Sequence, residues 1–176
     1  MPIISRLFPK EQTLKSQAIA VLRKKNFDFV KTIGSGEFGE VISCKSTNHH
    51  RKVAIKIVPS RNAKEQEHKL WNRVLHPNVL PLMDFMKFPE FEIFVMPLAE
   101  RSLYEFMKDR RFLRKSSSFE TTKNWLRGVL KGVDYLHKCG LCHLDVKIDN
   151  VLITSNKKAM LSDFSCVNTT EDKVVG

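Results

Sequence analysis

Three runs near the start of the chain alternate apolar and polar residues. They are FDFVKTIGSG at 27–36, EVISCKS at 40–46 and RKVAIKIV at 51–58. Alternation with a period of two is typical of β-strands that bury one face. A glycine cluster separates the first two runs, and the turn-like TNHH at 47–50 separates the last two. The pattern therefore predicts an antiparallel three-stranded meander.

One helix and two further strands are expected after the meander. Residues 62–75, NAKEQEHKLWNRVL, are rich in helix formers. This helix is expected to end at His76, because the residue before a proline is disfavoured in helical geometry. The apolar segments VLPLMDFM at 79–86 and FEIFVMPL at 91–98 indicate strands. Together these segments predict five strands with one inserted helix.

The second half of the chain is predicted to be mainly helical. SLYEFMKD at 102–109 indicates a short helix and RRFLRKSSS at 110–118 a polar loop. Ser117 and Glu120 have the spacing of a capping box that opens a longer helix, which ends near Gly140. The buried face of this helix is assigned to Leu126, Val129, Leu130, Val133 and Leu136.

Two shorter features complete the pattern. VLITS and KAMLSDFS are predicted to pair as a β-hairpin around Asn156. Residues 1–25 are interpreted as an N-terminal extension with a modest helical pattern. That pattern consists of Leu14, Ala18, Val21 and Leu22.

Composition places the chain among globular proteins. Its 176 residues are 42% hydrophobic, which is enough for one domain with a core. The longest apolar runs, such as 18–22, are far shorter than the ~20 residues that cross a bilayer. Arg6 and Lys10 interrupt the apolar N-terminus, and no small-residue cleavage site follows, so a secretory signal is not predicted. We expect a cytoplasmic or nuclear protein without a membrane partner.

The charge balance favours anionic ligands without specifying one. The 30 Lys+Arg and 19 Asp+Glu residues give a net charge of +11. Polyanions such as ATP, nucleic acid or acidic surfaces fit this excess, but so does an ordinary solvated surface. Basic residues cluster only at 23–25 and 110–115, and no aromatic-basic recognition motif accompanies them. No specific nucleic-acid partner is therefore expected.

The cysteines suggest one alternative chemistry. Cys44, Cys139, Cys142 and Cys166 are too few and too irregular for a disulfide scaffold, so free thiols are expected. CGLCH at 139–143 has the CxxCH spacing of a haem attachment site. A haem or redox protein would need a distal ligand or a second cysteine pair, and the chain contains neither at metal spacing.

A glycine-rich run lies between the first two predicted strands. Gly34, Gly36 and Gly39 have GxGxxGxV spacing, which also occurs in dinucleotide-binding folds, but there a helix follows and here a strand does. A glycine turn lets backbone N–H groups approach phosphates without interference from Cβ atoms. An ordinary glycine hairpin remains the alternative.

A lysine in the third strand suggests a partner for negative charge. Lys56 lies in the apolar VAIK, and burying it is costly unless it meets an anion such as a phosphate together with a carboxylate. Glu67 is the candidate carboxylate. The alternatives are an edge-strand lysine that reaches water for Lys56 and a solvent-facing helix position for Glu67.

The segment HLDVKIDN at 143–150 and the later DFS carry a second set of polar groups. Asp145, Lys147 and Asn150 are followed by Asp163 eighteen residues after Asp145. Two carboxylates and an amide supply the oxygen ligands that Mg²⁺ prefers, and a separate aspartate can orient a hydroxyl nucleophile.

In combination, GSGEFGEV, VAIK, HPN, HLDVKIDN and DFS resemble the motifs of the eukaryotic protein kinases, specifically the Ser/Thr class. The resemblance covers residues 26–176. It implies an α+β, two-lobed fold with an antiparallel five-stranded N-lobe and its one helix at about 26–98. A mainly helical, incomplete C-lobe would occupy about 99–176. The implied activity is transfer of the γ-phosphoryl group of ATP to a Ser or Thr hydroxyl of a protein substrate, with Mg²⁺.

The resemblance assigns a nucleotide site. Ile33 and Val41 would enclose the adenine together with Ala54 and Leu152, and Met96 would lie at the back of the pocket. Lys56 would hold phosphates and pair with Glu67. The full set of implied nucleotide contacts is Ile33, Gly34, Ser35, Gly36, Glu37, Phe38, Gly39, Glu40, Val41, Ala54, Lys56, Met96, Pro97, Ala99 and Leu152.

It also assigns catalytic roles. Asp145 would be the catalytic base, Lys147 would neutralise the γ-phosphoryl group, and Asn150 and Asp163 would hold magnesium. Lys56 and Glu67 complete the implied catalytic set. The four side chains that join the lobes in this family correspond to Leu82, Trp71, His143 and Phe164.

The sequence departs from the family pattern in four places, one of which is a link between Lys56 and Glu67 that is several residues shorter than in many kinases. Leu144 stands where an arginine usually meets a phosphorylated activation loop, so activity is expected not to need that phosphate. Ser165 replaces a flexible glycine. The sequence stops at KVVG, which resembles the residues before the substrate-binding end of the activation segment. Three interpretations are expected for this incomplete lobe: a fragment of a longer kinase, a C-lobe completed by a partner chain, or a poorly stable relic. An ATP-binding module without catalysis is the alternative function.

Overall fold

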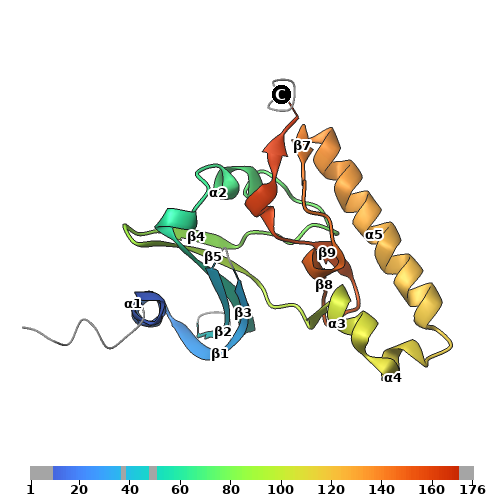
Figure 1. The fold of residues 1–176 in the computed structure, drawn as a ribbon, viewed down its shortest axis with the longest axis horizontal. Helices are drawn as coiled ribbons and strands as arrows, with labels where there is room; N and C mark the ends of the chain where they lie inside the picture. Colours follow the sequence, from blue (N-terminus) through green and yellow to red (C-terminus); the bar gives the residue numbers. More distant parts are fainter. Residues whose placement is uncertain (1–9, 37–38, 48–50, 171–176) are drawn as a thin grey trace, which may run out of the picture. The chain divides into compact units, whose positions relative to one another are not determined.

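A five-stranded antiparallel sheet follows the first helix, and the rest of the chain is mainly helical (Figure 1). The computed structural model describes residues 10–36, 39–47 and 51–170. Its contacts divide the chain into two units. Unit 1 comprises residues 1–63 and 83–97, and unit 2 comprises residues 64–82 and 98–176. The predicted α+β fold class is confirmed.

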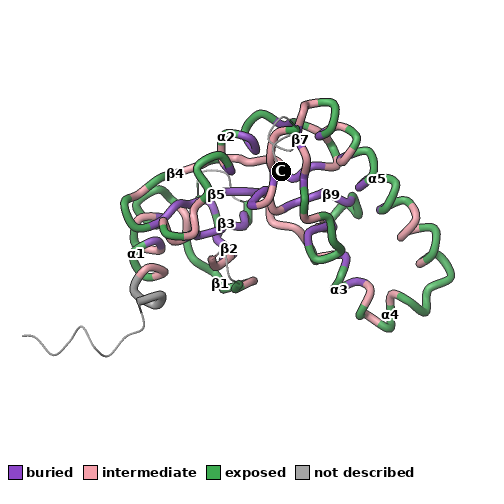
Figure 2. Tube along the Cα trace, turned by 45° about the horizontal axis from the view of Figure 1, so that its top comes forward, coloured by how far each residue is buried: buried purple, intermediate pink, exposed green. Residues whose placement is uncertain are grey.

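The sheet of unit 1 has the order β1-β2-β3-β5-β4, and every neighbouring pair is antiparallel. The predicted meander is therefore confirmed. The edge strand β1 is mostly exposed, whereas β3 and β5 are buried along most of their length (Figure 2). The strands are β1 (Phe27–Gly36), β2 (Gly39–Ser46), β3 (Arg51–Pro59), β4 (Asp84–Lys87) and β5 (Phe91–Pro97).

Helix α1 (Lys10–Lys24) belongs to the core of unit 1. Ala18 and Leu22 are buried, and Leu14 packs against the same cluster. Spacings of four residues place these three side chains on one helical stripe, which covers one face of the sheet. The sheet residues of this core are Ile42, Cys44, Val53, Ile55, Ile57, Met86, Phe91, Ile93 and Val95.

The strand predicted over 79–86 is divided between the two units. Only Asp84–Lys87 forms β4 in unit 1, whereas Val79 makes an isolated parallel bridge to Leu161 in unit 2. Pro81 lies between these two segments and has no N–H to donate to a ladder. The apolar run was therefore correctly identified as extended, but its prediction as one strand was wrong.

The helix predicted over 62–75 is shorter than expected. A 3-10 turn, η2 (Ser60–Asn62), is followed by extended backbone at Ala63, and α2 spans only Glu67–Trp71. Helix α2 is held by its buried side chains, since Trp71 is 1% exposed and its Nε1 donates a hydrogen bond to the carbonyl of Leu80 at 2.6 Å.

The capping box occurs at a different helix from the one predicted. Ser102 caps α3 (Leu103–Lys108), where its hydroxyl accepts from the amide of Glu105 and the Glu105 carboxylate accepts from the amide of Ser102. Ser117 has helical backbone angles and makes no side-chain cap at α5 (Ser118–Lys138). The segment predicted as a loop contains one further helical turn, α4 (Arg110–Leu113).

The buried face of α5 also differs from the prediction. Leu126 is 47% exposed and Leu130 is 68% exposed. Gly128 and Gly132 face the Asn78 segment instead, and a Cβ atom on them would lie 2.6 Å and 2.8 Å from Asn78 atoms. Because the two glycines have no side chains, this segment can approach the helix closely. The buried face of α5 therefore includes the two glycines in place of Leu126 and Leu130. The buried residues are Trp125, Gly128, Val129, Gly132 and Leu136.

The predicted hairpin is confirmed in unit 2. Strands β8 (Val151–Ile153) and β9 (Ala159–Leu161) pair antiparallel, and β6 (Arg101–Ser102) adds a third strand. A second small ladder joins β7 (Leu141–Cys142) to β10 (Asn168–Thr169). The turns η3 (Ile148–Asn150) and η4 (Phe164–Cys166) flank these strands. Of the helices in the described part of the chain, none has the length and apolarity needed to span a membrane.

Candidate active site

The glycine-rich turn lies at the end of the β1–β2 hairpin in unit 1. Gly34 pairs with Val41, and Gly36 pairs with Gly39. Gly39 has φ +131°, and a Cβ atom there would lie 2.1 Å from the carbonyl oxygen of Ile57. Only glycine therefore fits this position. Glu37 and Phe38, which belong to the predicted nucleotide set, lie outside the described residues.

Strand register gathers four of the predicted nucleotide contacts on one face of this sheet. Val41 pairs with Lys56 across β2 and β3, and Ala54 pairs with Met96 across β3 and β5. Residues that are directly opposite, or two apart along one strand, share a face. This is the face opposite the one that α1 covers, because Ile42 and Ile55 of the α1 core alternate with these positions.

Lys56 is buried in the centre of the sheet. It is 9% exposed, and its Nζ lies 5.8 Å from the centroid of the Phe94 ring. Because β3 is the central strand of five, the edge-strand alternative for Lys56 is wrong. Glu67 is 3% exposed in α2, so the solvent-facing alternative for it is also wrong.

The remaining predicted nucleotide residues are found in both units. Ile33 is 42% exposed, at an irregularity in the β1–β2 pairing between Thr32 and Gly34. Pro97 ends β5, Ala99 is half-buried just beyond it, and Leu152 lies in β8. Their nucleotide contacts remain predictions.

In unit 2, two predicted catalytic residues and one predicted magnesium ligand meet around one carboxylate. Lys147 Nζ lies 2.7 Å from Asp145 Oδ2. Asn150 Nδ2 donates to the same oxygen at 2.8 Å and to the carbonyl oxygen of Asp145 at 2.9 Å. The 3-10 turn η3 brings Asn150 back to Asp145 over five residues. This carboxylate is therefore oriented by two donors.

The same contacts set the charge of the pair. The hydrogen bond from Lys147, with a smaller contribution from Asn150, lowers the pKa of Asp145 below its usual 3.8. The hydrogen bond that Lys147 donates to Asp145 raises the pKa of Lys147 above 10.5. Asp145 is therefore ionised and Lys147 is protonated at neutral pH.

His143 is a packing residue beneath this loop. It is 2% exposed, and its Nε2 lies 3.0 Å from the carbonyl oxygen of Ser162. Burial lowers its pKa below 6.5. Trp71 and Phe164 stack with ring centroids 5.1 Å apart, and His143 meets Phe164 edge-on at 5.9 Å. The predicted stack is confirmed for these three residues, and Leu82 is half-buried.

The segment 143–150 is called the catalytic loop below. Asp163 lies close enough to this loop to affect the pKa of a residue in it. Its negative charge raises the pKa of Asp145, against the stronger effect of Lys147. Its backbone is left-handed, with φ 66° and ψ 87°, and its Oδ1 accepts from the amide of Ser165 at 3.3 Å. The neighbouring Ser162 bonds to the carbonyl of Asn150 through both its amide and its hydroxyl. The DFS segment is thereby attached to the catalytic loop.

The donor set around Asp163 fits magnesium only together with phosphate oxygens. Both bonds of the Asn150 amide group use Nδ2, which leaves Oδ1 as the atom that can ligate a cation. In the described part of the chain, no cluster of three or more His, Cys, Asp and Glu side chains could hold a metal ion. Mg²⁺ commonly binds through one or two protein oxygens plus the phosphates of its nucleotide.

The cysteines do not support a haem site. All four are free thiols, and burial raises the pKa of Cys44 to about 11. Cys139 ends α5 and Cys142 lies in β7, while the histidine of the CxxCH string is packed against Phe164. A buried histidine bonded to Ser162 cannot also face a haem iron.

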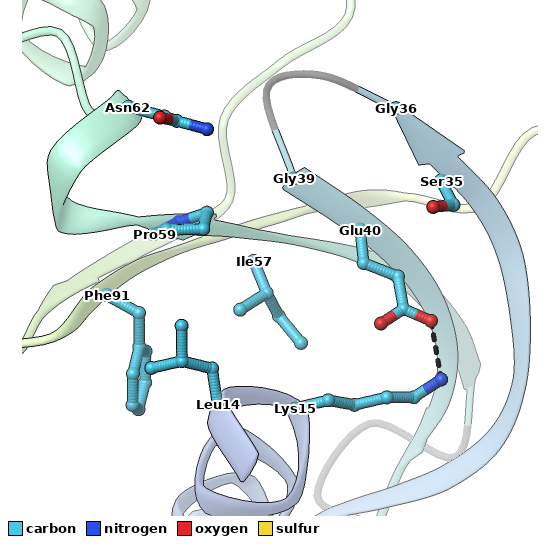
Figure 3. Close-up of a pocket in the computed structure, with 10 residues that line it drawn as sticks. All are labelled: Leu14, Lys15, Ser35, Gly36, Gly39, Glu40, Ile57, Pro59, Asn62 and Phe91. Carbon is cyan, nitrogen blue, oxygen red and sulfur yellow. Dashed lines mark hydrogen bonds and ion pairs between the residues drawn. The ribbon is translucent and has the colours of Figure 1, made fainter. Parts of the chain in front are cut away.

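Sequence reasoning missed Lys15. Its ammonium group lies 2.5 Å from Glu40 Oε1, at the start of β2 (Figure 3). The available signal was that Lys15 comes three residues before Ala18, on the apolar stripe of the helix. Treating residues 1–25 as an extension left this signal unused.

Comparison with known proteins places these features in one family. The model of the protein kinase domain matches residues 27–175. A probable serine/threonine-protein kinase KIN1 homolog of Enterocytozoon bieneusi is 26% identical over 163 residues, which cover 82% of this chain and 27% of that protein.

Two further relatives are similar. The carbon catabolite-derepressing protein kinase of Saccharomyces cerevisiae is 26% identical over 155 residues, covering 84% of this chain and 24% of that protein. Serine/threonine-protein kinase GRIK1 of Arabidopsis thaliana is 29% identical over 193 aligned positions, covering 97% of this chain and 47% of that protein. The chain spans about a quarter of the length of the first relatives, 27% and 23%.

Proposed function

The chain belongs to the protein kinase domain family, and on this basis we propose that it transfers the γ-phosphoryl group of ATP to a serine or threonine hydroxyl of a protein substrate. The observation that carries this proposal is the orientation of the Asp145 carboxylate. Lys147 and Asn150 hold one of its oxygens at 2.7 Å and 2.8 Å. The other oxygen, Oδ1, is the atom we assign to the substrate hydroxyl.

The charge state of the catalytic loop suits this role. Asp145 is ionised at neutral pH because Lys147 lowers its pKa, so it can accept a hydrogen bond from the hydroxyl and then its proton. Lys147 is protonated and can balance negative charge on the transferred group. A lysine two residues after the base is the Ser/Thr pattern, and two of the three relatives named above are Ser/Thr kinases by name.

The residues of unit 1 supply phosphate binding in this proposal. Backbone N–H groups of the glycine turn bind phosphates. Gly34 and Gly36 have no side chains that would keep the phosphates away from these groups. Lys56 holds a second phosphate position from the buried centre of β3. The apolar surface for the adenine is formed by Val41, Ala54 and Met96, which lie on one face of the sheet.

Magnesium, when bound, neutralises charge on the phosphates. Asn150 Oδ1 and Asp163 are the groups that would hold it. Hydrogen bonds through Ser162 and Ser165 fix the backbone on both sides of Asp163. Glu67, buried in α2, keeps its predicted supporting role. Because Leu144 cannot bind a phosphate group, activity is proposed not to require phosphorylation of the activation loop.

The test is Asp145→Asn, which keeps the shape of the side chain and removes the base. We expect phosphoryl transfer to a serine-containing peptide to fall about 10²- to 10⁴-fold, the usual contribution of a general base. The Kd for Mg-ATP, measured by calorimetry, should change little. Asp149→Asn is the matched control, because Asp149 is an exposed aspartate of the same loop.

Two results would count against the proposal. Full transfer by Asp145→Asn would remove the assignment of the base. Nucleotide binding by the unaltered chain without transfer to serine, threonine or tyrosine peptides would instead support an ATP-binding module.

A further inference from the structure

Helix α1 carries a charged side chain to the base of the glycine-rich turn. Ala18 and Leu22 are buried against the face of β2 that includes Ile42 and Cys44. Because side chains alternate along a strand, Glu40 lies on this same face, two residues before Ile42. Lys15, one helical turn before Ala18, is thereby brought to Glu40 (Figure 3).

The ammonium group of Lys15 contacts both strands of the hairpin. It lies 2.5 Å from Glu40 Oε1 on β2 and 2.5 Å from Thr32 Oγ1 on β1. The Thr32 hydroxyl lies 2.8 Å from the same Glu40 oxygen, which closes a triangle of hydrogen bonds. The Phe29 ring centroid lies 5.6 Å from the ammonium. The side chains of Lys15 and Glu40 are only 27% and 26% exposed, so water screens their interaction incompletely.

These contacts occur where the backbone ladder is interrupted. The β1–β2 register shifts between Phe29 and Lys31 and again between Thr32 and Gly34. A bulge leaves a residue unpaired and weakens the local ladder. The side-chain triangle joins the two strands at the second irregularity, immediately before the turn residues Gly34, Ser35 and Gly36.

Lys15 does not belong to the nucleotide face itself. Glu40 and Val41 are consecutive in β2 and point to opposite faces of the sheet, and Val41 is on the face with Lys56. On the α1 side, a cavity of only about 90 Å³ lies below the turn (Figure 3). Its lining includes Leu14, Lys15 and Glu40 together with the turn residues Ser35, Gly36 and Gly39. That volume cannot hold a nucleotide, so any effect of Lys15 on nucleotide binding must pass through the hairpin.

We propose that Lys15 is a positioning residue for nucleotide binding: by joining Glu40 to Thr32, it holds the glycine-rich turn in the conformation that presents its amides to phosphate. This inference rests on the proposed function only in that the turn binds a nucleotide. A turn that is less often in its binding conformation raises the apparent Kd in proportion. Helix α1 thus contributes to the site without touching the ligand.

Lys15→Met in the full chain tests the proposal, since it keeps the aliphatic stem and removes the ammonium. We expect the Kd for Mg-ATP to rise about 5-fold, a typical effect for a partly buried charged contact. Hydrogen exchange of the Gly34, Ser35 and Gly36 amides, measured without nucleotide, should accelerate. Thr32→Val removes the two hydrogen bonds of the triangle that involve β1 and keeps the contact between Lys15 and Glu40; it should produce the same two changes to a smaller extent.

The controls separate positioning from folding. Lys24→Met changes an exposed lysine of the same helix and should leave affinity and exchange unaltered. Lys15→Arg should restore most of both. Unaltered exchange at the turn in Lys15→Met and Thr32→Val, or an unaltered Kd despite faster exchange, would overturn the proposal. If the unaltered chain binds no Mg-ATP, the proposed function fails, while the exchange measurement still decides whether Lys15 holds the turn.

Discussion

At the scale of single residues, His143 links the catalytic loop to the stability of unit 2. Its ring is buried against Phe164 and bonded to Ser162. Burial lowers its pKa, so the folded chain binds a proton there less readily than the unfolded chain does. The stabilisation is therefore complete above the unfolded pKa of about 6.5 and is lost as the pH falls toward the lower, folded value.

This argument predicts a pH-dependent stability that His143→Gln reduces. Below about pH 6.5, the free energy of unfolding should fall as the pH falls, by at most about 1.4 kcal/mol per pH unit through this one residue. His143→Gln should be less stable overall but should lose that slope, as measured by urea denaturation at several pH values. His137→Gln, an exposed histidine of α5, should retain it. An equal slope in both variants would contradict the assignment.

The glycines of the turn have different requirements. A Cβ atom on Gly39 would meet the Ile57 carbonyl at 2.1 Å, whereas a Cβ atom on Gly36 would meet nothing within 4 Å. Gly39→Ala should lower the free energy of unfolding by roughly 2–4 kcal/mol. Gly36→Ala should leave thermal stability unchanged and weaken Mg-ATP binding, because its added methyl group lies where a phosphate would approach. A Gly36→Ala variant with unaltered affinity would favour an ordinary glycine hairpin.

Individual site residues were largely predictable because each has a chemical reason to stand at its position. Asp145, Lys147 and Asn150 are close in sequence, and a short turn is sufficient to bring them together. Lys56 was identified by its cost of burial, and the structure buries it. Lys15 could not be identified in this way, since a lysine on an amphipathic helix is ordinary until the strand that it meets is known.

At the scale of elements, α5 shows why counting apolar residues failed. Leu126 and Leu130 fit the helical period, yet both are exposed. The helix packs against the side chain of Asn78 at Gly128 and against the backbone of Asn78 at Gly132, and the two glycines allow this approach. Such close packing depends on residues without large side chains. A pattern of large apolar residues does not indicate where it occurs. The capping box was predicted at the wrong helix. Ser117 takes helical backbone angles, so its side chain makes no cap there.

Gly132→Ala tests this packing. In an exposed helix interior, the change would stabilise the helix by about 1 kcal/mol through propensity. Here the new methyl group would lie 2.8 Å from the carbonyl oxygen of Asn78, so we expect a net loss of about 1–2 kcal/mol in the free energy of unfolding. Lys131→Ala, at an exposed neighbouring position, should be close to neutral in the same denaturation experiment. Stabilisation by Gly132→Ala would show that α5 does not pack on the Asn78 segment.

At the scale of the whole molecule, the order of elements was predictable and their allocation to units was not. The meander, the fifth strand and the C-terminal hairpin follow local alternation, and all are confirmed. The segment after α2 is divided because Val79 bridges to Leu161, more than eighty residues later. A pairing across that distance leaves no local periodicity from which to predict it. Residues 1–25 were likewise interpreted as an extension separate from the folded domain, because the apolar stripe of helix α1 is short.

The start of the folded region can be tested with Leu22→Ala. Leu22 is 1% exposed and lies in a core with Ile42 of β2, Ile55 of β3 and Ile93 of β5. Removing its side chain should leave a cavity and lower the free energy of unfolding by about 2–5 kcal/mol, measured by denaturant unfolding with far-ultraviolet circular dichroism. Lys24→Ala, on the exposed side of the same helix, should change it by less than about 0.5 kcal/mol. If residues 1–25 were an extension outside the fold, the two variants would unfold at the same denaturant concentration. A difference between them would therefore mean that the kinase N-lobe of this chain includes α1, which is also the condition under which Lys15 can act on the glycine-rich turn.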